Sequence, residues 1–116
     1  MNGQVAPVHP APASPVLVTG ANGFIATHLC RALRAAGCAV RGLILAGTDP
    51  ATIAAMGVEV HTGDILRPDT LAAPMRGART VFHLAALARD WGRWDDFRAV
   101  NAGGTRNVLE AAAAAG

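Results

Sequence analysis

The residues whose types and spacing most clearly suggest a chemical role are two glycines and an alanine, three positions apart: Gly20, Gly23 and Ala26. They follow an apolar run and open a helical pattern. Glycine at 20 permits a tight turn out of a strand, and glycine at 23 lets the backbone approach a pyrophosphate. Ala26 is small enough for the helix to pack closely on a sheet. The amides of the bend, from Asn22 to Ile25, would then grip a diphosphate.

Taken alone, a spaced pair of glycines is a weak signal in a chain with 13 glycines, and the alternative is an ordinary strand-to-helix turn. The context favours the functional interpretation. A strand is expected before the pair, a helix after it, and the βαβ unit closes within about thirty residues. The sequence therefore predicts nucleotide binding at this turn.

Several kinds of active site are excluded by residue types that the sequence lacks. It contains no lysine and no tyrosine, and its only serine is Ser14. All ten basic residues are arginines, spread without a run against eight acidic residues, so neither nucleic acid nor a membrane surface is an expected partner. Cys30 and Cys38 have no CxxC spacing and no ligand cluster, so we expect no metal site and reduced thiols in a cytoplasmic protein.

The positions of these residues follow from alternating strand and helix patterns. Helix ends are indicated by Gly37 at a C-terminus, by Asp49 and Pro50 as N-cap and N1, and by Asp95 and Asp96 at an N-terminus. The expected strands cover residues 16–19, 39–45, 58–60 and 80–84, and the expected helical segments cover 24–36, 51–56, 68–75 and 95–115.

This alternation predicts an α/β fold with a Rossmann-like parallel sheet, comprising the first four strands of a doubly wound architecture. A chain of 116 residues accommodates one domain. Four of the seven prolines lie within residues 1–15, so we expect a disordered Pro/Ala-rich leader there and the domain over residues 16–116. The leader lacks the pattern of a secretory signal, and no apolar run is long enough to span a bilayer.

Four motifs in register resemble the extended short-chain dehydrogenases, also called the NAD-dependent epimerase/dehydratase family. The motifs are Thr19–Ala26, Gly63-Asp64-Ile65, Val81–Ala86, and Asn101-x-x-Gly104-Thr105-x-Asn107-Val108-Leu109. The segment 90–97 further resembles members similar to 3β-hydroxysteroid dehydrogenase. The resemblance covers residues 16–116 and implies a dinucleotide cofactor, NAD or NADP.

The resemblance also implies roles for individual residues. Asp64 and Ile65 would flank adenine, and Asn101 would support the active site from its helix. The cofactor-binding positions it implies are Gly20, Asn22, Gly23, Phe24, Ile25, Ala26, Asp64, Ile65, Leu84, Ala85 and Ala86.

Other interpretations apply to several of these residues. Asp64 also suits a turn or cap, and Asn101 also suits a polar helix surface, although its stripe favours an inward position. For His83, a packed and hydrogen-bonded histidine is favoured over a base or ligand. Trp91 and Trp94 cover the site or, as we favour, pack against the helix start.

The sequence departs from the family pattern at the catalytic residues. Full-length members use a Ser or Thr and a Tyr-x-x-x-Lys, and neither tyrosine nor lysine occurs here, so no catalytic residue is assigned. The resemblance therefore implies an N-terminal fragment, the NAD(P)-binding portion of an oxidoreductase, epimerase or dehydratase that ends before the chemistry. The strand at 80–84 would form an exposed sheet edge. Members of the family commonly dimerise through the helix expected at 95–115, which implies a homodimer.

Two questions stay open at this point. The end of the second strand reads Leu45-Ala46-Gly47, with neither the acidic residue typical of NAD binding nor the arginine typical of NADP binding; Arg41 precedes it and Asp49 follows it. The function is either the cofactor-binding portion of an enzyme or a non-catalytic dinucleotide-binding or interaction module. A helix-covered sheet without a ligand is a third interpretation.

Overall fold

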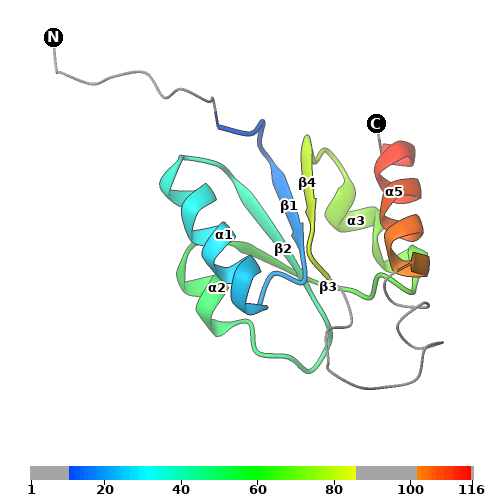
Figure 1. The fold of residues 1–116 in the computed structure, drawn as a ribbon, viewed down its shortest axis with the longest axis horizontal. Coiled ribbons are helices and arrows are strands. Elements are labelled where there is room, and N and C mark those ends of the chain that lie inside the picture. Colours follow the sequence, from blue (N-terminus) through cyan, green and yellow to red (C-terminus); the bar gives the residue numbers. More distant parts are fainter. Residues whose placement is uncertain (1–10, 86–101, 116) are drawn as a thin grey trace, which may run out of the picture.

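The computed structural model describes residues 11–85 and 102–115. These residues form a sheet with helices on both sides (Figure 1). In chain order the elements are β1 (Val16–Thr19), α1 (Phe24–Ala35), β2 (Val40–Ile44), α2 (Ala51–Ala55), β3 (Glu59–Thr62), the 3-10 helix η1 (Pro68–Thr70), α3 (Ala72–Met75), β4 (Thr80–His83) and α5 (Gly104–Ala115).

The sheet is parallel throughout the described residues, with the strand order β3-β2-β1-β4. β1 is central: Val16 pairs with Val40 of β2 on one side and with Thr80 of β4 on the other. The chain therefore adds strands outward from β1 in one direction and then returns to its opposite side. This order confirms the predicted Rossmann-like α/β fold, and it places a topological switch point between β1 and β4.

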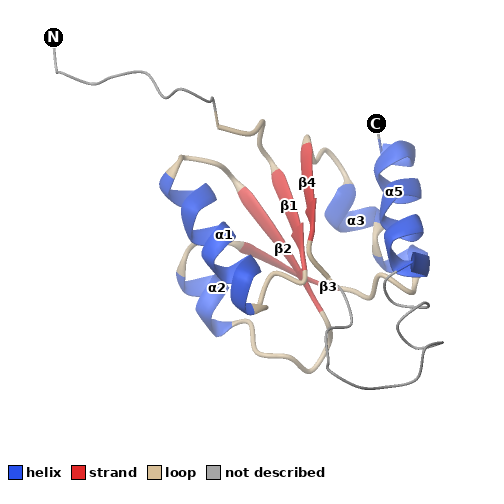
Figure 2. Ribbon diagram, viewed as in Figure 1, coloured by secondary structure: helices blue, strands red, loops and turns tan. Residues whose placement is uncertain are grey.

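The two faces of the sheet carry separate cores, and Figure 2 shows the helices on either side of the strands. On one face, α1 and α2 cover a cluster built from small and aliphatic side chains, including Val18, Ala26, Cys30 and Ile53. On the other face, η1, α3 and α5 cover a cluster of Leu17, Leu43, Ile65, Leu71, Met75 and Val108. Successive residues of β1 point to opposite faces, so all four are buried.

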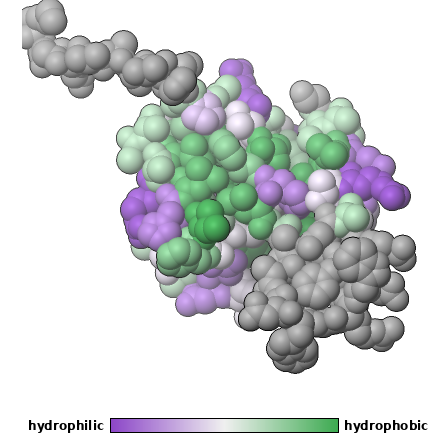
Figure 3. Space-filling model, viewed as in Figure 1, coloured by the Kyte–Doolittle hydropathy of each residue, from purple (hydrophilic) through white to green (hydrophobic). Residues whose placement is uncertain are grey.

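Helix α1 follows the sequence pattern closely. Its buried residues, Ala26, Cys30 and Leu33, recur at helical spacing on one face. Gly37 ends it with φ +87°, a left-handed conformation that favours glycine, and its amide donates to the Arg34 carbonyl at 3.0 Å. In Figure 3, hydrophobic side chains gather over the middle of this view of the molecule and hydrophilic ones lie around them.

The start of α2 is held by the aspartate that the sequence indicates. The Asp49 carboxylate accepts a hydrogen bond of 2.9 Å from the Ala51 amide. The helix begins at Ala51, as predicted, and its N-cap is Pro50, one residue after the predicted N-cap Asp49. The carboxylate nevertheless satisfies one of the free amides of the first turn.

Several predicted boundaries need correction. β3 covers Glu59–Thr62 and not 58–60, because its pairing with β2 extends from Glu59 opposite Arg41 to Thr62 opposite Ile44. Polar residues are tolerated there since β3 is an edge strand. The segment predicted as helical over 68–75 divides into η1 and α3. The helix predicted over 95–115 is described from Gly104 onward, and residues 95–101 lie outside the described range.

The leader is attached to the sheet at its last residues. The carbonyl of Ala13 accepts from the Thr80 hydroxyl at 2.7 Å, and the carbonyl of Pro15 accepts from the Arg79 amide at 2.9 Å. These two contacts join the last residues of the expected leader to the start of β4. Residues 1–10 lie outside the described range.

The packing of α5 generates a first prediction. A Cβ on Gly104 would lie 2.8 Å from Ile65 Cγ1 and closer still to its terminal methyl, whereas a Cβ on Gly103 would meet nothing within 4 Å. We expect Gly104→Ala to lower the free energy of unfolding by about 1–3 kcal/mol, measured by urea denaturation, because it overpacks the core. The matched variant Gly103→Ala should leave stability unchanged or raise it. Equal effects of the two substitutions would contradict this account.

Candidate functional site

The predicted phosphate turn lies at the carboxyl ends of β1 and β4, at the switch point of the sheet. Gly20 follows β1 with φ +62° and folds the chain back so closely that a Cβ would lie 2.9 Å from Ala85 Cα. Ala85 comes two residues after β4. Glycine at 20 is thus required twice, by its backbone conformation and by the close approach of a second chain segment.

Helix α1 begins beside this turn with free backbone donors. Gly23 is its N-cap in an extended conformation, its amide donates to the Gly20 carbonyl at 3.0 Å, and no side chain among the described residues caps the helix. A Cβ on Gly23 would approach only the Gly20 carbonyl oxygen, at 3.3 Å. The first turn therefore presents its amides and the positive end of the helix dipole to open space.

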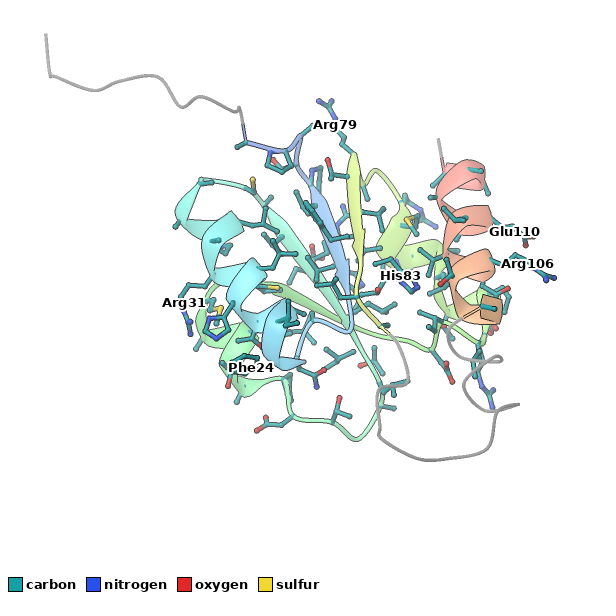
Figure 4. All side chains as sticks on the ribbon, viewed as in Figure 1. Phe24, Arg31, Arg79, His83, Arg106 and Glu110 are labelled. Atoms are coloured by element: carbon teal, nitrogen blue, oxygen red, sulfur yellow. The ribbon has the colours of Figure 1, made fainter. Side chains whose placement is uncertain are left out.

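The side chains of the first turn of α1 divide between core and solvent. Ala26 is buried in the core between the helix and the sheet, which is the close packing that the sequence predicts for a small residue. Phe24 and Ile25 are 82% and 72% exposed. Figure 4 shows Phe24 at the start of the helix, away from Arg79, which marks the opposite end of the sheet. The side chains of Phe24 and Ile25 therefore point to solvent, and the groups that these two residues present to the turn are their backbone amides.

A cavity of about 400 Å³ adjoins the turn, within the usual size range of ligand pockets. Its wall combines the ends of β1, β2 and β4 with the segment after β3. The lining residues are Gly20, Asn22, Gly23, Leu43, Ile44, Leu45, Thr48, Gly63, Asp64, Ile65, Leu66, Leu84 and Ala85. Seven of the eleven predicted cofactor residues are thus brought to one cavity.

The structure shows Asp64 in the turn that the sequence allowed for, and it places the residue in the lining of the cavity. One carboxylate oxygen, Oδ1, accepts from the Leu66 amide at 2.9 Å, which is a turn-stabilising contact. The Asp64 amide donates to the Thr70 hydroxyl oxygen at 2.9 Å. Oδ2 has no hydrogen-bond partner among the described residues. The turn thus fixes the side chain and leaves one oxygen to accept a hydrogen bond from a ligand.

Ile65 contributes to the cavity mainly as part of the core. Its side chain is only 6% exposed and packs between the sheet and α5. Its carbonyl accepts from Asn107 Nδ2 on α5 at 2.8 Å. Asn107 and Thr70 were not among the predicted site residues, although both hold the Gly63–Leu66 segment in place.

Thr19, the last residue of β1, begins the first motif but was not among the predicted site residues. Its buried hydroxyl oxygen accepts from the amides of Leu84 and Ala85 at 2.9 and 3.1 Å and lies 2.7 Å from His83 Nδ1. On the other side of the ring, Nε2 lies 3.0 Å from the Thr105 hydroxyl of α5. A single hydroxyl thus ties the end of β1 to the segment that follows β4.

These contacts define the protonation of His83. The Thr19 oxygen already accepts two amide hydrogens, so its own hydrogen is donated to Nδ1, which must be unprotonated. Nε2 then carries the proton and donates to the Thr105 hydroxyl. Burial lowers the pKa of His83, which favours the same neutral form. The structure confirms a packed, hydrogen-bonded histidine, and Figure 4 shows His83 between β4 and α5.

Other predicted residues cannot be placed. Ala86, Asn101, Trp91 and Trp94 lie outside the described residues. Arg41, considered from the sequence for the cofactor end of β2, donates instead to the carbonyls of Pro74 and Arg76, and its Nε lies 3.5 Å from a Glu59 carboxylate oxygen. Arg41 is therefore engaged toward the amino end of the strand.

A second and larger cavity, of about 530 Å³, lies between α3 and α5. Its wall is formed largely by alanines of α5 with Pro68, Ala72 and Gly77, and Arg76, Asn107 and Glu110 add its polar groups. Of the residues that line it, none belongs to a strand or to the turn between β1 and α1. The smaller cavity at the phosphate turn is therefore the candidate functional site.

The fold and the site together define an open parallel α/β protein with a ligand crevice at the carboxyl ends of its strands. Residues 16–116 match the NAD dependent epimerase/dehydratase family, so the chain belongs to that family. This finding confirms the resemblance that the four motifs indicated. In the described part of the chain, the helices are too short and too polar to cross a bilayer.

Known relatives agree with this family. A 2-alkyl-3-oxoalkanoate reductase of Shewanella oneidensis is 37% identical over 87% of this chain and 26% of its own length. A 3 beta-hydroxysteroid dehydrogenase/Delta 5-->4-isomerase of Mycobacterium tuberculosis is 39% identical over 87% of this chain and 29% of its own. The chain thus spans less than a third of these relatives.

A solved structure supports the same assignment. A short-chain dehydrogenase/reductase superfamily protein from Agrobacterium tumefaciens, with bound NAD, superposes with a TM-score of 0.69 at 35% identity. The match covers 87% of this chain and 29% of that one.

The close approach at the turn leads to a test of Gly20. We expect Gly20→Ala to destabilise the fold by about 2–5 kcal/mol, because it adds left-handed strain of about 1–2 kcal/mol to an overlap with the Ala85 backbone of about 1–3 kcal/mol. Gly37→Ala is the matched control: its φ is also positive, +87°, but a Cβ there meets nothing within 4 Å. Urea denaturation of both variants separates the two contributions, and equal losses would mean that the Ala85 contact is unimportant.

The neutral state of His83 predicts a pH dependence of stability. Since its pKa is lowered in the folded chain, protons bind preferentially to the unfolded chain below its ordinary value of 6.5. The stabilising contribution is therefore complete above pH 6.5 and declines as the pH falls through the lowered pKa. We expect urea denaturation to show this decline between pH 7.5 and 5. In His83→Asn, whose oxygen can accept from Thr19 without titrating, the slope should be smaller; an unchanged slope would exclude His83 as its source.

Proposed function

We propose that this chain is the dinucleotide-binding portion of an NAD(P)-dependent oxidoreductase, epimerase or dehydratase. The observation that carries the proposal is the uncapped start of α1 beside a cavity at the β1–β4 switch point. Free amides and a helix dipole favour an anionic group, and the absence of a Cβ at Gly23 leaves room for it. Family membership and a relative solved with NAD support the same ligand.

The chain's own residues supply binding and orientation. The backbone from Asn22 to Ile25 would hold the pyrophosphate, and the free carboxylate oxygen of Asp64 would accept from the exocyclic amine of adenine. Leu84 and Ala85 would line the cavity toward the ribose and nicotinamide. When bound, the cofactor supplies hydride transfer at its nicotinamide ring.

The proton-transfer residues of the reaction would come from a longer protein. The family's Tyr-x-x-x-Lys has no counterpart here, since the sequence contains neither tyrosine nor lysine. The chain's coverage of less than a third of its relatives agrees with a larger enzyme. The substrate would be recognised by that remaining part. The cytoplasmic location, the mobile leader and the homodimer through the helix at 95–115 stay predictions.

The same lack of catalytic residues favours a second candidate function, a non-catalytic dinucleotide-binding or interaction module. A reading frame that continues into a fifth strand and a Tyr-x-x-x-Lys would support the enzyme. The module would be supported if the 116-residue chain is itself the protein made in the cell, is stabilised by a dinucleotide and catalyses no reaction.

The dinucleotide proposal is tested at Gly23. Its φ of −74° suits any residue, and a Cβ there would meet only the Gly20 carbonyl oxygen, at 3.3 Å, so a small backbone shift should let Gly23→Val fold while its side chain blocks the phosphate. We expect NAD⁺ and NADP⁺ at 100 times the dissociation constant to stabilise the unmodified chain by about 2.7 kcal/mol. The variant should show no such stabilisation in a thermal shift assay.

Gly103→Val is the control for this experiment, because it makes the same substitution at the start of α5, where a Cβ meets nothing within 4 Å. It should keep the ligand response. Failure of the unmodified chain to respond to any dinucleotide, or a full response in Gly23→Val, would overturn the proposed function.

A further inference from the structure

The segment that follows β2 points to a cofactor preference. We propose that the chain selects NAD over NADP because this segment offers an acceptor to a ribose hydroxyl and no cation to a 2′-phosphate. The inference rests on the proposed function. In this fold class the end of the second strand faces the adenosine ribose, whose 2′ substituent is the only difference between the two cofactors.

Leu45 occupies the decisive position. It comes directly after β2, is 55% exposed and lines the cavity. An arginine at such a position neutralises a 2′-phosphate, and an acidic residue binds the 2′ and 3′ hydroxyls. A leucine does neither, so the preference is decided by its polar neighbours.

Thr48 is the nearest of these neighbours that also lines the cavity. Its hydroxyl donates to the Leu45 carbonyl at 2.6 Å. Because that hydrogen is already used, the Thr48 oxygen can only accept a further hydrogen bond. A ribose hydroxyl has a hydrogen to donate, whereas a phosphate dianion at this position is an acceptor and would face another acceptor.

The charged groups around this end of the cavity are unfavourable to a phosphate. Asp64 lines the cavity, and Asp49, the residue after Thr48 in the sequence, holds its carboxylate on the Ala51 amide. Asn22 fastens the segment to the phosphate turn by donating from Nδ2 to the Asp49 carbonyl at 3.5 Å. The first amide of α2 is already bonded to the Asp49 side chain, so it offers nothing to an anion.

The described arginines do not compensate. None of them lines the cavity. Arg41 is bonded toward the amino end of β2, and Arg34 donates to the carbonyls of Cys38 and Met56. Arg31 lies against His28 on the outer side of α1 (Figure 4). Within residues 11–85 and 102–115, the cavity lining therefore offers a 2′-phosphate no guanidinium and one carboxylate, that of Asp64.

Isothermal titration calorimetry of the 116-residue chain with NAD⁺ and with NADP⁺ tests this preference directly. We expect NAD⁺ to bind at least about tenfold more tightly, a ratio that corresponds to one missing charge partner. NADP⁺ binding equal to or tighter than NAD⁺ would overturn the inference and leave the proposed function standing. Binding of neither nucleotide would overturn the proposed function and the inference with it.

A charge introduced at the proposed position should reverse the effect. Leu45→Arg is expected to tighten NADP⁺ binding about tenfold or more and to change NAD⁺ binding by less than about threefold. The matched control is Leu109→Arg, which makes the same substitution at a 65% exposed position of α5 outside the cavity. An equal gain in both variants would indicate general electrostatic attraction and contradict a specific 2′ position.

A second variant keeps the test independent of how Leu45→Arg folds. Thr48→Val removes the accepting oxygen and preserves the shape of the side chain, so NAD⁺ affinity should fall about fivefold while NADP⁺ affinity changes less. Circular dichroism of each variant establishes that it is folded. Equal losses of affinity for the two nucleotides would show that Thr48 does not distinguish a 2′ hydroxyl from a 2′-phosphate.

Discussion

The structure depends on one close contact between segments distant in sequence, the approach of the turn after β1 to the residues after β4. Gly20 passes so close to the Ala85 backbone that a Cβ would lie 2.9 Å from Ala85 Cα, and the buried hydroxyl oxygen of Thr19 accepts hydrogen bonds from both amides that follow β4. Beyond its last strand residue, β4 has no ladder partner for these amides, and unsatisfied buried amides are costly. The threonine replaces the missing ladder partner, and a side chain at position 20 would force the two segments apart.

The site follows from this contact. With β1 and β4 held together at their carboxyl ends, the start of α1 is directed over the crevice, and Leu84 and Ala85 become one of its walls. The opposite wall comes from β2 and from the segment after β3, where Asp64, Thr70 and Asn107 form a hydrogen-bonded support. Each wall is therefore positioned by backbone hydrogen bonds to side chains outside the glycine motif. The glycine motif leaves space for a ligand and provides backbone hydrogen-bond donors, and the residues around it determine the shape of the cavity.

Much of the fold was predictable because its signals are local. The bounds of β1 were predicted without error, and α1 was predicted from apolar spacing and Gly37 to within one residue. β3 was less accurate, since an edge strand contains polar residues such as Glu59 and His61 that lack an apolar signature. The interaction of Thr19 with His83 was not predictable from either residue, because it joins positions 64 apart and requires the strand order. Thr48 was missed because its role depends on a hydrogen bond to Leu45 that no motif records.

The central position of β1 also leads us to expect an order in which the strands associate during folding. Its first partner, β2, pairs Val40 with Val16, whereas its second partner, β4, pairs Thr80 with the same residue across a much longer stretch of chain. Closing the longer loop costs more conformational entropy, so β1, β2 and β3 have the shorter route to association. The crevice would then form only when β4 pairs with the free side of β1. A ligand that binds both walls of the crevice would therefore stabilise the last step of assembly, the pairing of β4 with β1.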